Sequence, residues 1–170
     1  LASRGSTITG SNGANWGIDL SSSSNNATGN TIRAGGALSD NYGVQVSGNN
    51  NTIMSNTILT DGTNYNYGIL IQGTSVNTTV AFNTINSSGS GNKNNGIQIS
   101  TDKANNTIIY SNKINTSKSS SRGMQIANGK QINWYVNVSS NIINTGGSSS
   151  DGILFNALQR SNITDNIITT

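Results

Sequence analysis

The side chains of this chain that could perform acid–base chemistry are six aspartates, because the sequence contains no histidine, cysteine or glutamate. Imidazole bases, thiol nucleophiles and the usual zinc ligands are therefore excluded. Glycoside cleavage and Ca²⁺ binding both need carboxylates that converge within a few ångströms. The aspartates instead fall at six different positions of the repeat described below, so we predict no catalytic pair, no metal site and no cofactor. They are Asp19, Asp40, Asp61, Asp102, Asp151 and Asp165.

Aromatic residues supply a second kind of candidate site. Trp16, Tyr42 and Tyr67 each stand one place before a glycine that recurs along the chain, so we expect them to lie side by side in space. An outward aromatic strip would be flat and suited to sugar rings. The alternative is that the three residues fill a corner of the core or only stabilise each other by offset stacking. The sequence leaves both interpretations open.

Basic residues and glycosylation sequons give weaker signals. Lys103, Lys130 and Arg160 have similar positions in the last repeats, which would form either a basic row against anionic polysaccharide or a solvated face. Eight N-x-S/T sequons are candidate glycan attachment sites, a number that chance accounts for in a chain so rich in Asn, Ser and Thr. They start at Asn26, Asn50, Asn77, Asn86, Asn105, Asn115, Asn137 and Asn162.

The element that must position these groups is a repeat of 25 to 29 residues. Each repeat has a glycine followed by two alternating apolar residues, a period typical of a strand with one buried face. The glycines are Gly17, Gly43, Gly68, Gly96, Gly123 and Gly152. Two further apolar columns follow, always five residues apart: Ile53, Val80, Ile109, Val138 and Ile163, then Ile58, Ile85, Ile114, Ile143 and Ile168.

Three short strands per repeat and no helical period predict an all-β fold in which each strand lies beside its copy in the next coil. We expect a right-handed single-stranded parallel β-helix, or solenoid, of about six coils with three short strands per coil. The right hand follows from the handedness of parallel crossovers. Residues 1–170 form one domain in this interpretation, with coils starting near residues 16, 42, 67, 95, 122 and 151.

One asparagine recurs between the second and third apolar columns. Stacked in consecutive coils, its side-chain amide would donate to one neighbour and accept from the next, which predicts an Asn ladder. Asn also tolerates the left-handed backbone of a sharp corner. In the first coil Gly35 is expected to replace it, with Ile32 before it in the second apolar column and Ala37 after it in the third. The predicted ladder residues are Asn56, Asn83, Asn112, Asn141 and Asn166.

The alternation of N-x-x-G-I-x-I with N-T-I-x-x-N-x-I resembles the right-handed parallel β-helix repeat superfamily over residues 16–168. That superfamily includes pectate-lyase-like polysaccharide enzymes, phage tailspikes, surface adhesins and proteins of no known activity. The resemblance implies the fold, and no residue of the catalytic motifs can be carried over to this chain.

Composition narrows the classes of partner. Only 32% of the residues are apolar, the formal charge of +3 is too dilute for a nucleic-acid surface, and no apolar run approaches the length needed to span a bilayer. The chain begins at Leu1 rather than Met, which suggests a processed form or a fragment. Either origin is compatible with secretion. Together with the polar loops and the candidate glycan sites, this favours an extracellular or cell-surface location.

The ends of the repeat lack an amphipathic helix or polar cap, which repeat proteins generally need. Ile8 and Ile18 at one end and Phe155 and Ile168 at the other are expected to form open apolar rungs that pair head to tail with further copies. The sequence thus favours a non-enzymatic extracellular structural protein, with glycans as further partners. The alternative is a carbohydrate-binding or carbohydrate-processing β-helix that belongs to a larger surface protein or tailspike-like enzyme.

Overall fold

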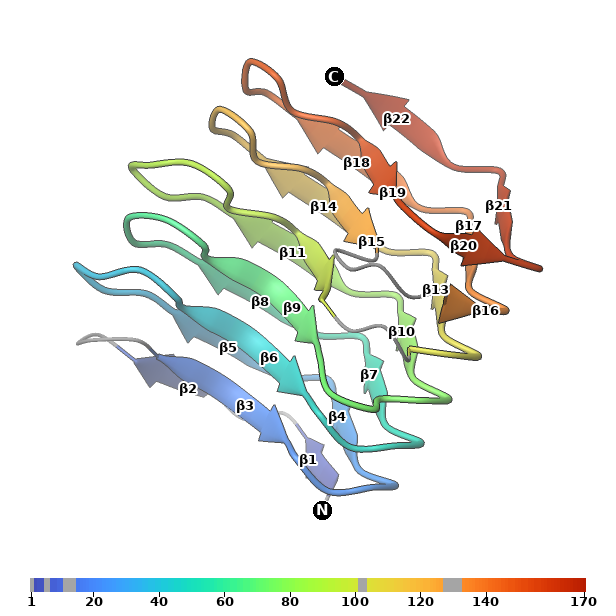
Figure 1. Ribbon diagram of the computed structural model, residues 1–170. Helices are drawn as coiled ribbons and strands as arrows, with labels where there is room; N and C mark the ends of the chain where they lie inside the picture. The colour runs from blue at the N-terminus through green and yellow to red at the C-terminus, as the bar shows by residue number, and fades with distance from the viewer. Residues whose placement is uncertain (1, 5–6, 11–14, 101–103, 127–132) are drawn as a thin grey trace.

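The computed structural model describes residues 2–4, 7–10, 15–100, 104–126 and 133–170. Within these ranges the chain forms strands, turns and loops without a helix, and successive coils stack along one axis (Figure 1). Every strand pairs in parallel with its copy in the next coil. The predicted all-β solenoid with three strands per coil is confirmed, whereas its right hand stays a prediction.

Three parallel sheets, named A, B and C here, form the walls of the solenoid. Sheet A contains β1 (Ala2–Arg4), β4 (Asn26–Thr28), β7 (Thr52–Met54), β10 (Thr79–Ala81), β13 (Ile108–Tyr110), β17 (Asn137–Ser139) and β21 (Asn162–Thr164). Sheet B contains β2 (Thr7–Gly10), β5 (Thr31–Ala34), β8 (Thr57–Thr60), β11 (Thr84–Ser87), β14 (Lys113–Thr116), β18 (Ile142–Thr145) and β22 (Ile167–Thr169).

Sheet C contains β3 (Trp16–Leu20), β6 (Tyr42–Val46), β9 (Tyr67–Ile71), β12 (Ile97–Ile99), β15 (Met124–Ile126) and β19 (Ile153–Phe155). The chain therefore makes six coils that each pass through sheets C, A and B in turn, preceded by β1 and β2. A short pair, β16 (Asn133–Trp134) with β20 (Leu158–Gln159), extends the side between sheets C and A in the last coils.

The core consists of the predicted apolar columns. Ile58, Ile85 and Ile114 of sheet B are fully buried, as are Ile53, Val80 and Ile109 of sheet A. Because the buried side chains repeat in register from coil to coil, each packs on its own copies along the axis and on the other two sheets across it. The buried apolar side chains thus stand in columns that shield one another from water, whereas others, such as Trp16, Ile108 and Ile142, are exposed on the outside.

The recurring glycines in sheet C face the core at a point of close approach. A Cβ added to Gly123 would lie 2.2 Å from Cγ2 of Ile143 and 2.5 Å from the carbonyl oxygen of Gly152. The same close contact with the sheet B isoleucine recurs at the other five glycines, so this column has no room for a side chain. The sequence period shows where the glycines recur, and the close packing against sheet B explains why each of these positions must be glycine.

The predicted Asn ladder is confirmed. Nδ2 and the backbone N–H of Asn83 both donate to Oδ1 of Asn112, at 2.9 and 3.0 Å, and Asn112 makes the same pair of bonds to Asn141. Asn56, Asn83, Asn112 and Asn141 are at most 1% exposed. Asn166 accepts from Asn141 in the last coil and is half-buried.

Two expectations about this corner are wrong. In the first coil the ladder residue is Asn30, which donates to Oδ1 of Asn56, and not Gly35. Ala27 pairs with Ile53 and Ile32 with Ile58, so a small alanine fills the second apolar column where an isoleucine was expected.

The ladder asparagines also do not adopt the left-handed conformation. The residue before each of them does, with φ between +53° and +69° at Gly29, Ser55, Phe82, Ser111, Ser140 and Asp165. This residue turns the chain, and the asparagine that follows points inward to satisfy the corner's backbone groups.

The corner that leads into sheet C carries a second polar ladder, which sequence analysis missed. Nδ2 of Asn41 donates to Oδ1 of Asn66 at 2.8 Å, and Asn66 donates likewise to Asn94 at 2.7 Å. Ser121 and Ser150 continue the column, each accepting the backbone N–H of the preceding member. The change from Asn to Ser and the unequal spacing of 25 to 29 residues concealed this column in the sequence.

Candidate functional site

The outer face of sheet C carries the aromatic residues that sequence analysis singled out. Trp16, Tyr42 and Tyr67 are paired in register on β3, β6 and β9, as expected. Trp16 is 53% exposed, and the two tyrosines are half-buried. The strip therefore lies on the outside of the solenoid, on the side nearest the viewer in Figure 1.

The two tyrosine rings of the strip stack on each other. The rings of Tyr42 and Tyr67 lie 5.4 Å apart between centroids, with planes 5° from parallel. Because each tyrosine ring covers one face of the other, those two faces are closed to solvent. The strip thus faces outward, and its two tyrosines stabilise each other by stacking.

A pocket of about 340 Å³ opens beyond Tyr67, where the aromatic column stops. The next residues of the column are Asn95 and Arg122, identified by the backbone bonds of Gly68 to Asn95 and of Gly96 to Arg122. An amide is smaller than a phenol ring, which leaves space above the ring of Tyr67 on the side away from Tyr42. The described side chains around this space are two tyrosines, four amides, two cations and a leucine: Tyr65, Tyr67, Asn95, Gln98, Gln125, Asn156, Lys93, Arg122 and Leu154.

The amides of the pocket are held by one another. Asn95 Nδ2 donates to Oε1 of Gln98 at 2.7 Å and to Oε1 of Gln125 at 3.3 Å. Arg122 donates to the same Gln125 oxygen at 3.0 Å and to Oδ2 of Asp151 at 2.8 Å. These bonds fix the orientations of the polar side chains before a ligand arrives.

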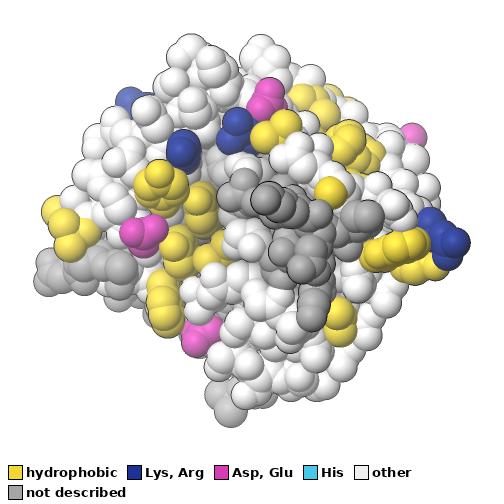
Figure 2. Space-filling view, in the orientation of Figure 1, with side chains coloured by type: hydrophobic (Ala, Val, Ile, Leu, Met, Phe, Trp, Pro, Cys, Tyr) yellow, Lys and Arg dark blue, Asp and Glu magenta, His cyan; other side chains and the backbone are white. Residues whose placement is uncertain are grey.

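Charge is unevenly distributed around the pocket. Among the described residues the ion pairs are Arg33–Asp61 and Arg122–Asp151, so Lys93 has no carboxylate partner there and instead lies over the ring of Tyr65, 5.3 Å from its centroid. Figure 2 shows basic, acidic and hydrophobic side chains distributed over this side of the molecule. The pocket therefore combines aromatic surface, fixed amides and a free ammonium group.

The tyrosines of the strip hold their phenolic protons tightly. Burial, followed by the negative charge of Asp40, raises the pKa of Tyr67 to about 12. Burial and a hydrogen bond from the Tyr42 hydroxyl to Asp40 Oδ1, at 3.1 Å, raise the pKa of Tyr42 still further. Both side chains are therefore neutral donors over the physiological pH range.

The aspartates have separate partners. Asp40 accepts from Tyr42, Asp61 from Arg33 and Asp151 from Arg122, and Asp19 lies 3.5 Å from the Gln45 amide. Asp102 lies outside the described residues. In the part of the chain that the structure describes, no three carboxylates gather where they could hold a metal ion.

The sequons divide into two groups by exposure. Asn26, Asn50, Asn77 and Asn162 are exposed. Asn86, Asn105, Asn115 and Asn137 are half-buried, and Asn115 Nδ2 donates to Oδ1 of Asn86 at 2.7 Å in an outer amide row that Asn144 extends. A glycan on Asn115 would compete with this bond, and one on Asn77 would compete with its bond to Oδ1 of Asn50, so exposed Asn26 and Asn162 are the better attachment sites. Glycosylation itself stays a prediction.

The residues predicted at the ends occupy the expected rungs. Ile18 is half-buried against the core, whereas Phe155 and Ile168 are 48% and 45% exposed in the last coil. Ile8 pairs with Ile32 in sheet B. Head-to-tail association stays a prediction, because further coils of a longer chain would cover the same rungs.

Two of the three predicted row-forming cations, Lys103 and Lys130, lie outside the described residues. The described residues also include no helix that is long and apolar enough to cross a membrane. Comparison with known protein families, with curated proteins and with solved structures finds no match to this chain.

Proposed function

We propose that this protein binds a polysaccharide chain on the outer face of sheet C without cleaving it. The observation that carries the proposal is the pocket that Tyr67, Arg122 and Asn156 line together, above the buried amides of Asn95, Gln98 and Gln125. A sugar ring has an apolar face that packs on an aromatic ring and a rim of hydroxyls that both donate and accept hydrogen bonds. The exposed amide of Asn156 can donate and accept, and Arg122 can donate, so these two side chains match that rim.

The ligand is proposed to carry acidic groups. Lys93 lines the pocket without a carboxylate partner among the described residues, and an ammonium group in such a position attracts a carboxylate or sulfate. The charge of Arg122 is balanced by Asp151, so this arginine contributes directed donors more than net charge.

The polymer is proposed to lie along the solenoid axis. Trp16, Tyr42, Tyr67 and the pocket follow one column over six coils, a length of roughly 24 Å at the usual strand spacing. This length accommodates several sugar units rather than one. The resemblance of the repeat to pectate-lyase-like β-helices supports the same class of ligand, and an extracellular or cell-surface location is proposed with it.

Matched arginine variants test the proposal. Arg122→Gln removes a pocket residue, and Arg33→Gln removes an arginine that pairs with the aspartate of the next coil in the same manner, but on sheet B. Binding to immobilised acidic polysaccharides, such as polygalacturonate and alginate, is expected to weaken about tenfold in Arg122→Gln and to be unchanged in Arg33→Gln. Equal binding by both variants, or no binding by the unmodified protein, would reject the proposal.

A second proposal, head-to-tail association, is supported by the exposed apolar rung of Phe155, Ile167 and Ile168 in the last coil. In the 170-residue chain, Ile168→Asp is expected to abolish concentration-dependent association measured by sedimentation velocity. Ile142→Asp, at an exposed position on the side of sheet B, is the control. A chain that stays monomeric at millimolar concentration would contradict this proposal.

A further inference from the structure

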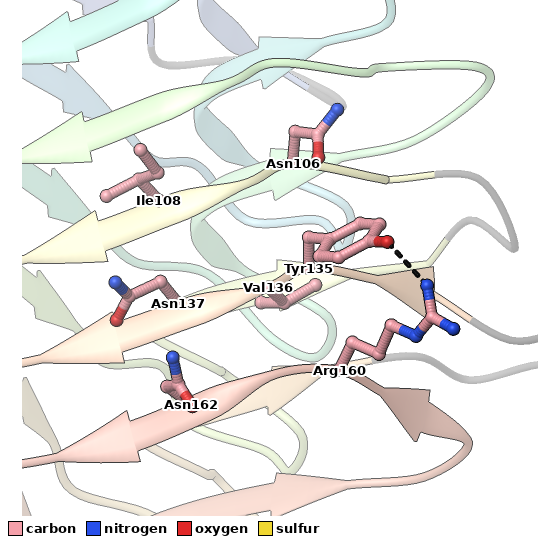
Figure 3. Close-up of a pocket in the computed structure, with 7 residues that line it drawn as sticks. All are labelled: Asn106, Ile108, Tyr135, Val136, Asn137, Arg160 and Asn162. Atoms are coloured by element: carbon pink, nitrogen blue, oxygen red, sulfur yellow. Dashed lines mark hydrogen bonds between the residues drawn. The ribbon is translucent and has the colours of Figure 1, made fainter.

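A second pocket, of about 280 Å³, lies at the corner that leads into sheet A in the last three coils (Figure 3). It is built from two columns of residues in register. The first column is the left-handed corner position of three successive coils, occupied by Asn106, Tyr135 and Arg160 with φ of +54°, +58° and +50°. The second is the first position of the sheet A strands, occupied by Ile108, Asn137 and Asn162.

The aromatic wall of this pocket is held in place. Nη1 of Arg160 donates to the hydroxyl of Tyr135 at 2.8 Å, as the dashed line in Figure 3 shows. The same guanidinium lies 5.4 Å from the ring centre of Trp134 and 6.0 Å from that of Tyr135. Arg160 therefore braces the ring of Tyr135, a residue that is 49% exposed.

Earlier coils show what this corner is like without the pocket. Asn50 and Asn77 occupy the same position, and Nδ2 of Asn77 donates to Oδ1 of Asn50 at 2.9 Å. Small amides that pair with each other leave no wall to enclose a ligand. The substitution of Tyr and Arg for Asn in the last two coils creates the enclosure.

The rest of the lining is apolar on one side and amide on the other. Ile108 is 41% exposed, although it begins a strand in a column that is otherwise Asn or Thr from β4 to β21. Asn137 and Asn162 line the other side of the pocket with their amide side chains. An exposed isoleucine, a braced tyrosine and two amides thus converge on one space.

We infer that this corner pocket binds a single pyranose ring. The apolar face of the sugar packs on Tyr135 and Ile108, and its hydroxyls hydrogen-bond to the amides of Asn137 and Asn162. The site lies on a different corner of the coil from the sheet C pocket and shares no residue with it, so it does not depend on the function proposed above.

The test uses protein expressed in a host without N-glycosylation, so that Asn137 and Asn162 are unmodified. The probes are methyl pyranosides of glucose, galactose, mannose and N-acetylglucosamine, titrated into ¹⁵N-labelled protein and followed by amide chemical shifts. At least one pyranoside is expected to shift the resonances of residues 106–108, 135–137 and 160–162, with millimolar affinity.

Tyr135→Ala and Phe82→Ala form a matched pair, because both aromatic residues are about half exposed at left-handed corners, with φ of +58° and +55°, and Phe82 lines neither pocket. Tyr135→Ala is expected to weaken pyranoside binding about tenfold, the equivalent of one aromatic contact, whereas Phe82→Ala leaves it unchanged. Asn162→Ala, at an exposed strand position, provides a second variant with the same expected loss if Tyr135→Ala does not fold. The inference is overturned if no pyranoside causes these chemical-shift changes, or if the changes persist in Tyr135→Ala.

Discussion

Nδ2 of Asn112 lies 3.0 Å from Oδ1 of Asn141, its counterpart one coil further along the chain. The same nitrogen also donates to the carbonyl oxygens of Val80 and Tyr110, each at 3.0 Å. One buried amide therefore connects the preceding coil, its own coil and the following coil at the same corner.

Removal of this amide is expected to be costly. Asn112→Ala leaves several buried backbone and side-chain groups without partners, at about 1–3 kcal/mol each, whereas Asn92→Ala changes an exposed side chain in a loop. Urea denaturation is expected to show a loss of at least 2 kcal/mol for Asn112→Ala and little change for Asn92→Ala. Equal midpoints for the two variants would contradict the ladder's role in stability.

The glycine column is expected to tolerate no side chain. In Gly123→Ala the new Cβ would lie 2.2 Å from Ile143 Cγ2, so the coil must shift or lose the contact, at about 1–3 kcal/mol. Gly146→Ala is the control, because the nearest atom to its Cβ would be 3.8 Å away. Thermal melting should separate the two variants, and a Gly123→Ala protein as stable as Gly146→Ala would refute the packing argument.

The left-handed corner residues restrict which side chains can precede the ladder. Ser111 has φ of +53°, a conformation that a β-branched residue strongly disfavours. We expect Ser111→Val to lower the free energy of unfolding by about 1–2 kcal/mol and Ser111→Asn to have little effect. Ser117→Val, which is exposed and has no positive φ, should be neutral in the same denaturation series.

The raised pKa of Tyr67 predicts that the free energy of unfolding depends on pH in the alkaline range. The folded-state pKa of Tyr67, raised to about 12 by burial and by Asp40, lies above the value of 10.0 for an unperturbed phenol. A group whose pKa is raised by folding stabilises the protein fully below its unfolded pKa and loses that contribution as the pH rises through the folded pKa. Stability should therefore fall between about pH 10 and pH 12, and Tyr67→Phe should reduce the fall. Identical pH profiles for both proteins, measured by urea denaturation, would rule out this assignment.

The sequence by itself determined the fold class and the ladder of Asn56 to Asn166. A fixed separation of five residues between two apolar columns makes the intervening corner identical in every coil, so local pattern and three-dimensional register agree. In the first coil the apolar pattern misled, because Ala27 takes a position that isoleucine or valine takes in the following coils and Ile32 belongs to the next column.

Only the tertiary structure decided the candidate sites. Tyr67 and Gln125 are far apart in sequence but line one pocket, because the solenoid brings residues that are one or more repeats of 25 to 29 residues apart to neighbouring positions. Since the loops differ in length from coil to coil, no fixed spacing in the sequence reveals that the two residues are neighbours. The brace between Arg160 and Tyr135 is equally invisible in the sequence, which relates Arg160 only to Lys103 and Lys130 and assigns Tyr135 to no recurring motif. The buried columns of a repeat can be read from the sequence because the same kind of side chain must fill them in every coil. A binding pocket arises where the side chains of one coil differ from those of the others. The shape of that pocket depends on the side chains in the coils on either side, which only the tertiary structure brings together.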